Sequence, residues 1–215
     1  MTTNKIWAWA WGASLALMFA MSEATYSQGI VYGTPQPPAY YAAPFIYSYS
    51  LDVNGDGVTD FLLNSQGDSA VIAPMGNNSI IAIPEPPPDL GSLIPALPSG
   101  FTIGSSLDPI FQWYHSNTDQ FGAAAIGSQQ DIGSISYFLG LTAYAGFDLY
   151  YAGADHYGWM RIANLDGVVS GQILDWAYET DPNTPILAGQ VPEPSTWVLL
   201  TTGAGLMLYR RKIFL

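Results

Sequence analysis

Oxygen-bearing side chains recur at alternate positions in the segment 52–60, DVNGDGVTD. Hard cations such as calcium bind carboxylate, amide and backbone carbonyl oxygens, and glycine at the sixth position of such a loop permits a sharp turn. The spacing therefore predicts a calcium site. Its expected ligands occupy positions one, three, five, seven (through the backbone carbonyl) and nine of the segment: Asp52, Asn54, Asp56, Val58 and Asp60.

These nine residues resemble the D-x-N-G-D-G-x-x-D calcium loops of dockerin, thrombospondin type 3 and FG-GAP repeats. Leu63 stands where an EF-hand has its bidentate glutamate, so we expect neither an EF-hand helix pair nor a sensor. Affinity should then lie in the weak range of extracellular modules, about 10⁻⁴–10⁻³ M. The alternative is a turn without metal, because Asp, Asn and Gly favour turns. If calcium binds, it should hold the structure rather than catalyse.

The last 25 residues, 191–215, have the form of a sorting signal. A short polar motif precedes the uncharged segment 196–209, which as a helix would reach roughly 21 Å, less than the ~30 Å hydrocarbon core. The basic residues after it should stay cytoplasmic and place the body beyond the inner membrane. The residues expected to form the sorting signal are the motif Val191, Pro192, Glu193, Pro194 and Ser195 and the cations Arg210 and Arg211.

This order of motif, apolar segment and basic stop resembles the PEP-CTERM tail of Gram-negative envelope proteins. The resemblance implies processing by an exosortase and an association with surface polysaccharide. A membrane anchor that is never cut is the alternative. The other end of the chain predicts a signal peptide over residues 1–24, which the Sec translocon would recognise. It has a cation at Lys5, an apolar segment at 6–20, and small residues at Ser22 and Ala24 before the cleavage site. The alternative is an N-terminal anchor that is not cleaved. We therefore expect an inner-membrane-anchored precursor that reaches the cell surface or the extracellular space.

The body between these signals, residues 25–190, is strongly acidic. Arg161 is its one basic residue against 15 carboxylates, a formal charge of −14. Such a surface repels phosphate backbones, so nucleic-acid binding is excluded as a function. The chain has no cysteine, which excludes disulfides, thiol nucleophiles and Cys-ligated metals.

The body shows no recognisable catalytic pattern. His115 and His156 are its two histidines, and the chain lacks HExxH, G-x-S-x-G, P-loop and Rossmann motifs. Glycosidases need two facing carboxylates, a pair that the sequence does not single out. We therefore predict that the protein is not an enzyme, with an acidic glycoside hydrolase as the third choice of function.

The elements that position these residues are predicted to be strands. Short runs of β-branched and aromatic residues alternate with Gly, Asn, Asp and Pro, which favours an all-β, sandwich or jelly-roll body with a helix at each terminus. Turns are expected at 76–78 and 164–167. The expected strands are 45–50, 59–64, 70–73, 80–83, 135–142, 147–151, 158–164 and 168–179. The expected parts are an extended leader (25–44), a hairpin subdomain (45–83), a Pro-rich loop (84–98) and a β-sandwich (99–190).

A second pattern, HYGWMR at 156–161 with LDWAYE at 174–179 and PILAG at 185–189, resembles one found in PEP-CTERM proteins. Arg161 should pair with Asp175 or Glu179 on the neighbouring strand. We expect a structural or adhesive surface protein, and the resemblance to PEP-CTERM proteins implies a link to exopolysaccharide. The alternative is a carbohydrate-binding module, in which aromatic side chains stack on sugars or else simply form core. Its candidate platforms are Trp113, Tyr114, Tyr150, Tyr151, Tyr157, Trp159 and Trp176.

Overall fold

The computed structural model describes the residues 29–42, 47–66, 69–84, 92–115, 124–130, 133–164 and 170–192. The expected signal peptide and residues 193–215 of the tail lie outside these ranges, as do the two expected terminal helices. Residues 30–192 form one compact unit. All regular elements in the described residues are strands or short turns, which confirms the predicted all-β class.

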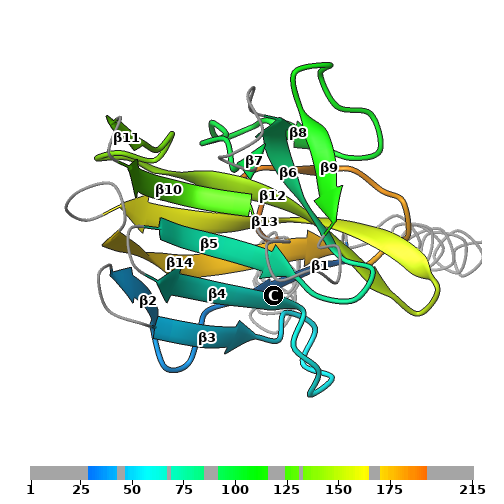
Figure 1. Cartoon of the computed structure of the whole chain (residues 1–215). Coiled ribbons are helices and arrows are strands. Elements are labelled where there is room, and N and C mark those ends of the chain that lie inside the picture. Colours follow the sequence, from blue (N-terminus) through cyan, green and yellow to red (C-terminus); the bar gives the residue numbers. More distant parts are fainter. Residues whose placement is uncertain are drawn as a thin grey trace, which may run out of the picture. The chain divides into compact units, whose positions relative to one another are not determined.

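One layer of the unit is built on three long antiparallel strands (Figure 1). They are β12 (Thr142–Tyr151), β13 (Ala154–Asn164) and β14 (Ser170–Glu179). β1 (Ile30–Gly33) and β2 (Ala39–Ala42) both pair with the free edge of β14. On the other side β12 pairs with β6 (Ser79–Pro84), which pairs in turn with β9 (Gln112–His115). Part of the expected leader therefore supplies two sheet strands.

The second layer lies in front of the first in Figure 1. Its strand order is β3, β4, β5, β10, with β11 and β7 pairing to β10. β6 belongs to both layers, because its end, Ile83 and Pro84, pairs with β7. The bounds are β3 (Tyr47–Leu51), β4 (Phe61–Gln66), β5 (Ser69–Pro74), β7 (Ser92–Leu93), β10 (Ala124–Gln130) and β11 (Gly133–Ile135).

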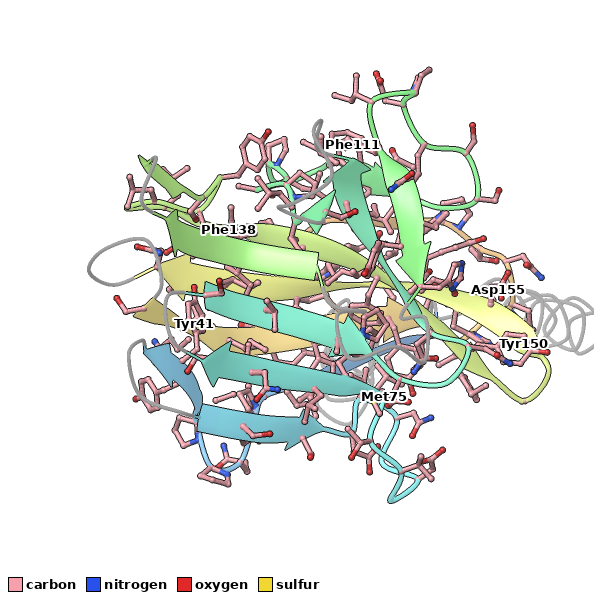
Figure 2. The ribbon with its side chains drawn as sticks, viewed as in Figure 1. Tyr41, Met75, Phe111, Phe138, Tyr150 and Asp155 are labelled. Atoms are coloured by element: carbon pink, nitrogen blue, oxygen red, sulfur yellow. The ribbon has the colours of Figure 1, made fainter. Side chains whose placement is uncertain are left out.

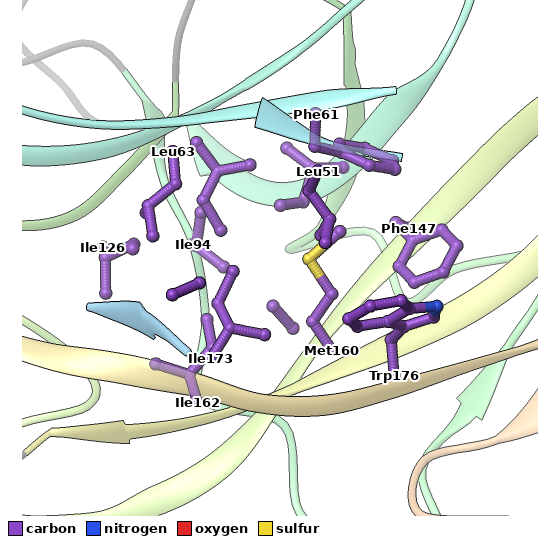
Figure 3. Packing of buried hydrophobic residues seen from close by; sticks show 14 of the residues in the cluster. Leu51, Phe61, Leu63, Ile94, Ile126, Phe147, Met160, Ile162, Ile173 and Trp176 are labelled. Atoms are coloured by element: carbon purple, nitrogen blue, oxygen red, sulfur yellow. The ribbon is translucent and has the colours of Figure 1, made fainter. Parts of the chain in front are cut away.

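The main core fills the space between the layers. Strand β5 alternates buried and half-buried residues, as expected for a strand with one face on the core. Figure 3 shows Leu51, Phe61 and Leu63 of one layer above Met160 and Ile173 of the other. Each such side chain contributes about 1.5–3 kcal/mol on full burial. The layers therefore form a sandwich-like arrangement.

A second core covers the outer face of the long strands. The short strands β8 (Thr102–Ile103) and β15 (Ile186–Leu187) pair with each other and form part of it. Trp159, Tyr157 and Ile81 point into this outer core, together with Leu97 and Ile186. As a result β12, β13 and β14 are buried on both faces over most of their length.

Three expected elements differ in the structure. The turn at 76–78 joins strands that do not pair with each other, so it carries the chain from one layer to the other and is not a hairpin. The expected strand 135–142 is interrupted by a turn at 137–140, in which Gly140 has φ +67°. The Pro-rich segment contains the buried strand β7 rather than loop alone. Strands β13 and β14 pair as expected, while residues 165–169 between them lie outside the description.

Candidate functional site

The segment 52–60 is the loop of the β3–β4 hairpin. The last cross-strand pair before the loop is Leu51 with Phe61, so all five expected calcium ligands fall in one connection. Gly55 and Gly57 have φ of +77° and +87°, a conformation that glycine adopts without a steric penalty. Gly57 therefore acts in the turn as the sequence predicts, and Gly55 adopts the same kind of conformation.

The side chains of Asp52, Asn54 and Asp56 accept hydrogen bonds from backbone N–H groups of the same loop. The Asp52 carboxylate accepts the N–H groups of Gly55 at 2.7 Å and Gly57 at 2.8 Å. Asn54 Oδ1 accepts the Asp56 N–H at 2.9 Å, and Asp56 Oδ1 accepts the Val58 N–H at 2.7 Å. These bonds satisfy the loop amides and fix the carboxylates at its surface.

Asp60 has a different role, because it is 6% exposed and ties the loop to the sheets. Its Oδ2 accepts the Val53 N–H at 2.8 Å, and its Oδ1 accepts the Asn78 side-chain amide at 3.3 Å. Burial raises the pKa of Asp60, and the hydrogen bonds from Val53 and Asn78 partly offset that rise. Asn78 Oδ1 in turn accepts the Tyr150 N–H at 2.8 Å. The sequence analysis did not identify Asn78 as a partner of the loop.

As a donor set, three carboxylates, one amide and one carbonyl fit a hard cation such as calcium. Within the described ranges, no three His, Asp or Glu side chains converge closely enough to hold a metal ion. The carboxylates of Asp52 and Asp60 are near enough that the charge of Asp52 raises the pKa of Asp60. Calcium binding at this loop stays a prediction.

Arg161 pairs with Asp175, one of the two expected partners. Its Nε donates to Asp175 Oδ1 at 2.9 Å, and a second bond runs from its guanidinium to Oδ2. The Tyr32 hydroxyl also donates to Oδ2, at 2.9 Å. The Asp175 side chain is 4% exposed and that of Arg161 39%, so the cation neutralises a buried carboxylate. Glu179 instead accepts the Asp181 N–H at 3.2 Å, and the His156 Nδ1 lies 3.0 Å from the Glu179 carbonyl.

The aromatic residues considered as sugar platforms are largely core. Trp159, Trp176 and Tyr157 are buried. The indole N–H of Trp159 donates to the Gln190 carbonyl at 3.0 Å, and that of Trp176 donates to the Val53 carbonyl at 3.3 Å. Trp113 is half-buried and stacks on Tyr157, with ring centroids 5.8 Å apart. Most of the aromatic residues considered as sugar platforms are therefore packed against other side chains of the protein.

The folded body ends directly before the expected sorting motif. Gln190 accepts the Trp159 indole N–H through its carbonyl, and its own N–H donates to the Leu187 carbonyl at 2.8 Å. Val191 and Pro192 follow as exposed residues outside any strand. Glu193, Pro194, Ser195, Arg210 and Arg211 lie outside the described residues. In the ranges that are described, no helix has the length and apolar character needed to cross a membrane.

Two polar residues that the sequence analysis missed lie opposite each other between the long strands. Ser79 on β6 is paired in register with Asp148 on β12, and both are buried. Burial and, to a lesser extent, the charge of Asp155 together raise the pKa of Asp148 to about 7. No local sequence pattern could have joined them, because 69 positions separate them and only the strand register brings them together.

Comparison of the chain with protein-family models, with curated proteins and with solved structures finds no match.

Proposed function

We propose that the protein is exported and sorted to the cell surface or extracellular matrix through its C-terminal tail, and that its body acts structurally or adhesively there. The observation that supports this most directly is the position of the domain end. The body is held by hydrogen bonds as far as Gln190, and the exposed Val191 and Pro192 begin the motif. The first two residues of the motif are therefore exposed to a processing enzyme.

A scaffold role is supported by the contacts of the body's tryptophans and of its one arginine, which are made within the fold. Trp159 and Trp176 bind backbone carbonyls in the cores, and Arg161 neutralises Asp175. The same groups would have to face solvent to hold a ligand. An acidic, tightly packed body suits a secreted matrix component, whose partner in this proposal is a surface polysaccharide.

Calcium at the 52–60 loop is part of the proposal, as a structural staple. Asp52, Asn54, Asp56, the Val58 carbonyl and Asp60 would hold the ion, whose positive charge would offset three neighbouring carboxylates. Asp60 supports this role because it already joins the loop to Asn78 and, through it, to β12. A bound ion would thereby stabilise the connection between the two layers.

The sorting proposal is tested by fractionating host cells that express the full chain or a variant. In Glu193→Ala/Pro194→Ala the expected motif is altered outside the body, so we expect the chain to remain with the inner membrane instead of reaching the surface. The matched control is Pro182→Ala, in an exposed turn of the body, which should be sorted normally. Normal surface delivery of the double variant would contradict the proposal.

A further inference from the structure

A row of polar side chains crosses the outer face of the first layer. His115 on β9 is paired with Ser79 on β6, Ser79 with Asp148 on β12, and Asp148 with Tyr157 on β13. Directly paired residues of antiparallel strands point to the same face of a sheet. The four side chains therefore project together, on the face that carries the outer core.

Two members of this row each carry a buried oxygen atom without a partner. Ser79 is 0% exposed and Asp148 is 7% exposed. Neither Ser79 Oγ nor Asp148 Oδ1 has a hydrogen-bond partner among the described residues. Buried polar atoms are nearly always paired with protein or water, so an unpaired couple on adjacent strands needs an explanation.

Two aromatic rings on the strands that flank this pair stack on each other. Trp113 on β9 stacks on Tyr157 on β13, with centroids 5.8 Å apart and ring planes at 23°. The strands β6 and β12 lie between β9 and β13, and neighbouring strands are about 4.8 Å apart. The rings meet by leaning towards each other over the two strands between them, which carry Ser79 and Asp148. We call the Trp113–Tyr157 stack the aromatic lid.

The charged surroundings of Asp148 are one-sided. From β13 it faces Asp155 and Tyr157, from β6 Ser79, and beyond Ser79 His115 of β9. Figure 2 places Asp155 and Tyr150 together at the hairpin end of β12 and β13. The body's one arginine, Arg161, is bound to Asp175. Burial is the first cause that raises the pKa of Asp148 to about 7, the Asp155 charge is the second, and a hydrogen bond from the His156 N–H partly offsets them.

We propose that Asp148 is a proton switch beneath the aromatic lid: neutral Asp148 keeps the lid closed, and loss of its proton opens the lid to water. An ionised carboxylate with an unpaired oxygen is more costly to bury than a neutral one, and the hydrogen bond from the His156 N–H leaves Oδ1 unpaired. Water that enters satisfies Asp148 and Ser79 together. In this proposal β9 is the element that moves, because among the described strands it pairs with β6 alone.

The test follows the near-ultraviolet circular dichroism of the Trp113–Tyr157 stack in the full-length chain from about pH 5 to about pH 9. The spectrum of Trp113→Phe is subtracted to isolate the stack from the other tryptophans. We expect the stack signal to fall by more than half as the pH rises through neutrality, and to stay constant in Asp148→Asn. A wild-type signal that does not change with pH, or the same change in Asp148→Asn, would overturn the proposal.

Two further variants should shift the pH midpoint of lid opening in opposite directions, which a purely structural role of Asp148 would not produce. Ser79→Ala removes an unpaired hydroxyl from the closed state, so the opening midpoint should move to higher pH. Asp155→Asn removes a neighbouring negative charge, so Asp148 should ionise more easily and the midpoint should move to lower pH. Asp181→Asn, in an exposed turn of the body, removes a carboxylate that does not act on Asp148; it is the control and should leave the midpoint unchanged. If Asp148→Asn does not fold, Ser79→Ala and Asp155→Asn still test the proposal: opening midpoints that move in the same direction in both variants would overturn it.

Discussion

Asn78 and Asp60 are joined by two hydrogen bonds across 18 residues of sequence. The Asn78 side-chain amide donates to the Asp60 carbonyl at 3.1 Å and to its Oδ1 at 3.3 Å, and Asn78 Oδ1 accepts the Tyr150 N–H at 2.8 Å. One buried amide thus connects the β3–β4 loop, the crossing between the layers and the end of β12.

The first prediction concerns Asn78. Replacing it with Ala leaves the Asp60 carboxylate and the Tyr150 N–H without this partner, so the free energy of unfolding should fall by about 2–3 kcal/mol. Urea denaturation measures it. Asn77→Ala, at the exposed neighbouring position, should change stability by less than about 0.5 kcal/mol. Equal effects of the two substitutions would show that Asn78 does not join the layers.

The second prediction concerns the ion pair. Arg161→Ala leaves the buried Asp175 carboxylate with the Tyr32 hydroxyl as its remaining side-chain donor. Because Arg161 itself is partly exposed, we expect a loss of about 2–3 kcal/mol, between the values for exposed and for buried pairs. In the double variant Arg161→Ala/Asp175→Asn the loss should be smaller, since no buried charge remains. A double variant less stable than Arg161→Ala would contradict this account.

The third prediction concerns the glycine of the HYGWMR segment. A Cβ on Gly158 would lie 2.4 Å or less from the Phe147 ring and 2.7 Å from the Ala177 carbonyl. Gly158→Ala should therefore cost more than about 3 kcal/mol, because the backbone carbonyl cannot move aside. Gly153→Ala is the comparison: its Cβ would meet nothing within 4 Å, and φ of +85° alone should cost about 1–2 kcal/mol. Thermal unfolding of both variants ranks them, and the reverse order would contradict the close packing.

The fourth prediction is the pH dependence of stability. Burial raises the folded-state pKa of Asp148 to about 7, above its ordinary value near 4. Between these values the folded state binds a proton that the unfolded state has lost, so the contribution of Asp148 is full below about pH 4 and declines up to about pH 7. Asp148→Asn should flatten this decline and exceed the wild type in stability at about pH 8. Denaturation midpoints at several pH values measure it; parallel curves for the two proteins would exclude a raised pKa.

The fifth prediction concerns calcium. A ligand that binds the folded state stabilises it by about 1.4 kcal/mol at ten times its dissociation constant. Millimolar calcium should therefore raise the melting temperature of the wild type by a few degrees, and Asp56→Ala should abolish the rise. Magnesium serves as the ion control, because it requires a tighter octahedral site. An unchanged melting temperature would leave the loop as a metal-free turn.

Local pattern was enough to predict several of the strands. The runs that became β4, β5, β6 and β14 alternate or concentrate apolar residues between turn residues. Charge predicted that Arg161 pairs with Asp175 or Glu179, and the structure selects Asp175. Pairing over long distances was not predictable. β1 and β2 are four residues each and gain their structure from β14, and β7 is a strand only because β6 and β10 flank it.

The aromatic residues show a second limit of sequence reading. Trp113, Trp159 and Trp176 look alike in the sequence, yet Trp159 and Trp176 fill opposite faces of the same layer and Trp113 lies over its outer face. The difference follows from register: Trp176 is paired with Met160 and shares its face, while Trp159, the next residue on β13, points to the opposite face. Ser79 and Asp148 meet for the same reason, through register rather than motif.

The central claim, that the tail directs sorting, is tested most directly by mass spectrometry of the C-terminal peptide of the protein recovered from its own host. The account predicts a C-terminus close to Pro192–Pro194, just beyond the last residue held by the fold, with Arg210 and Arg211 absent. A C-terminus at Leu215 in the surface fraction would contradict it and would identify the tail as a retained anchor.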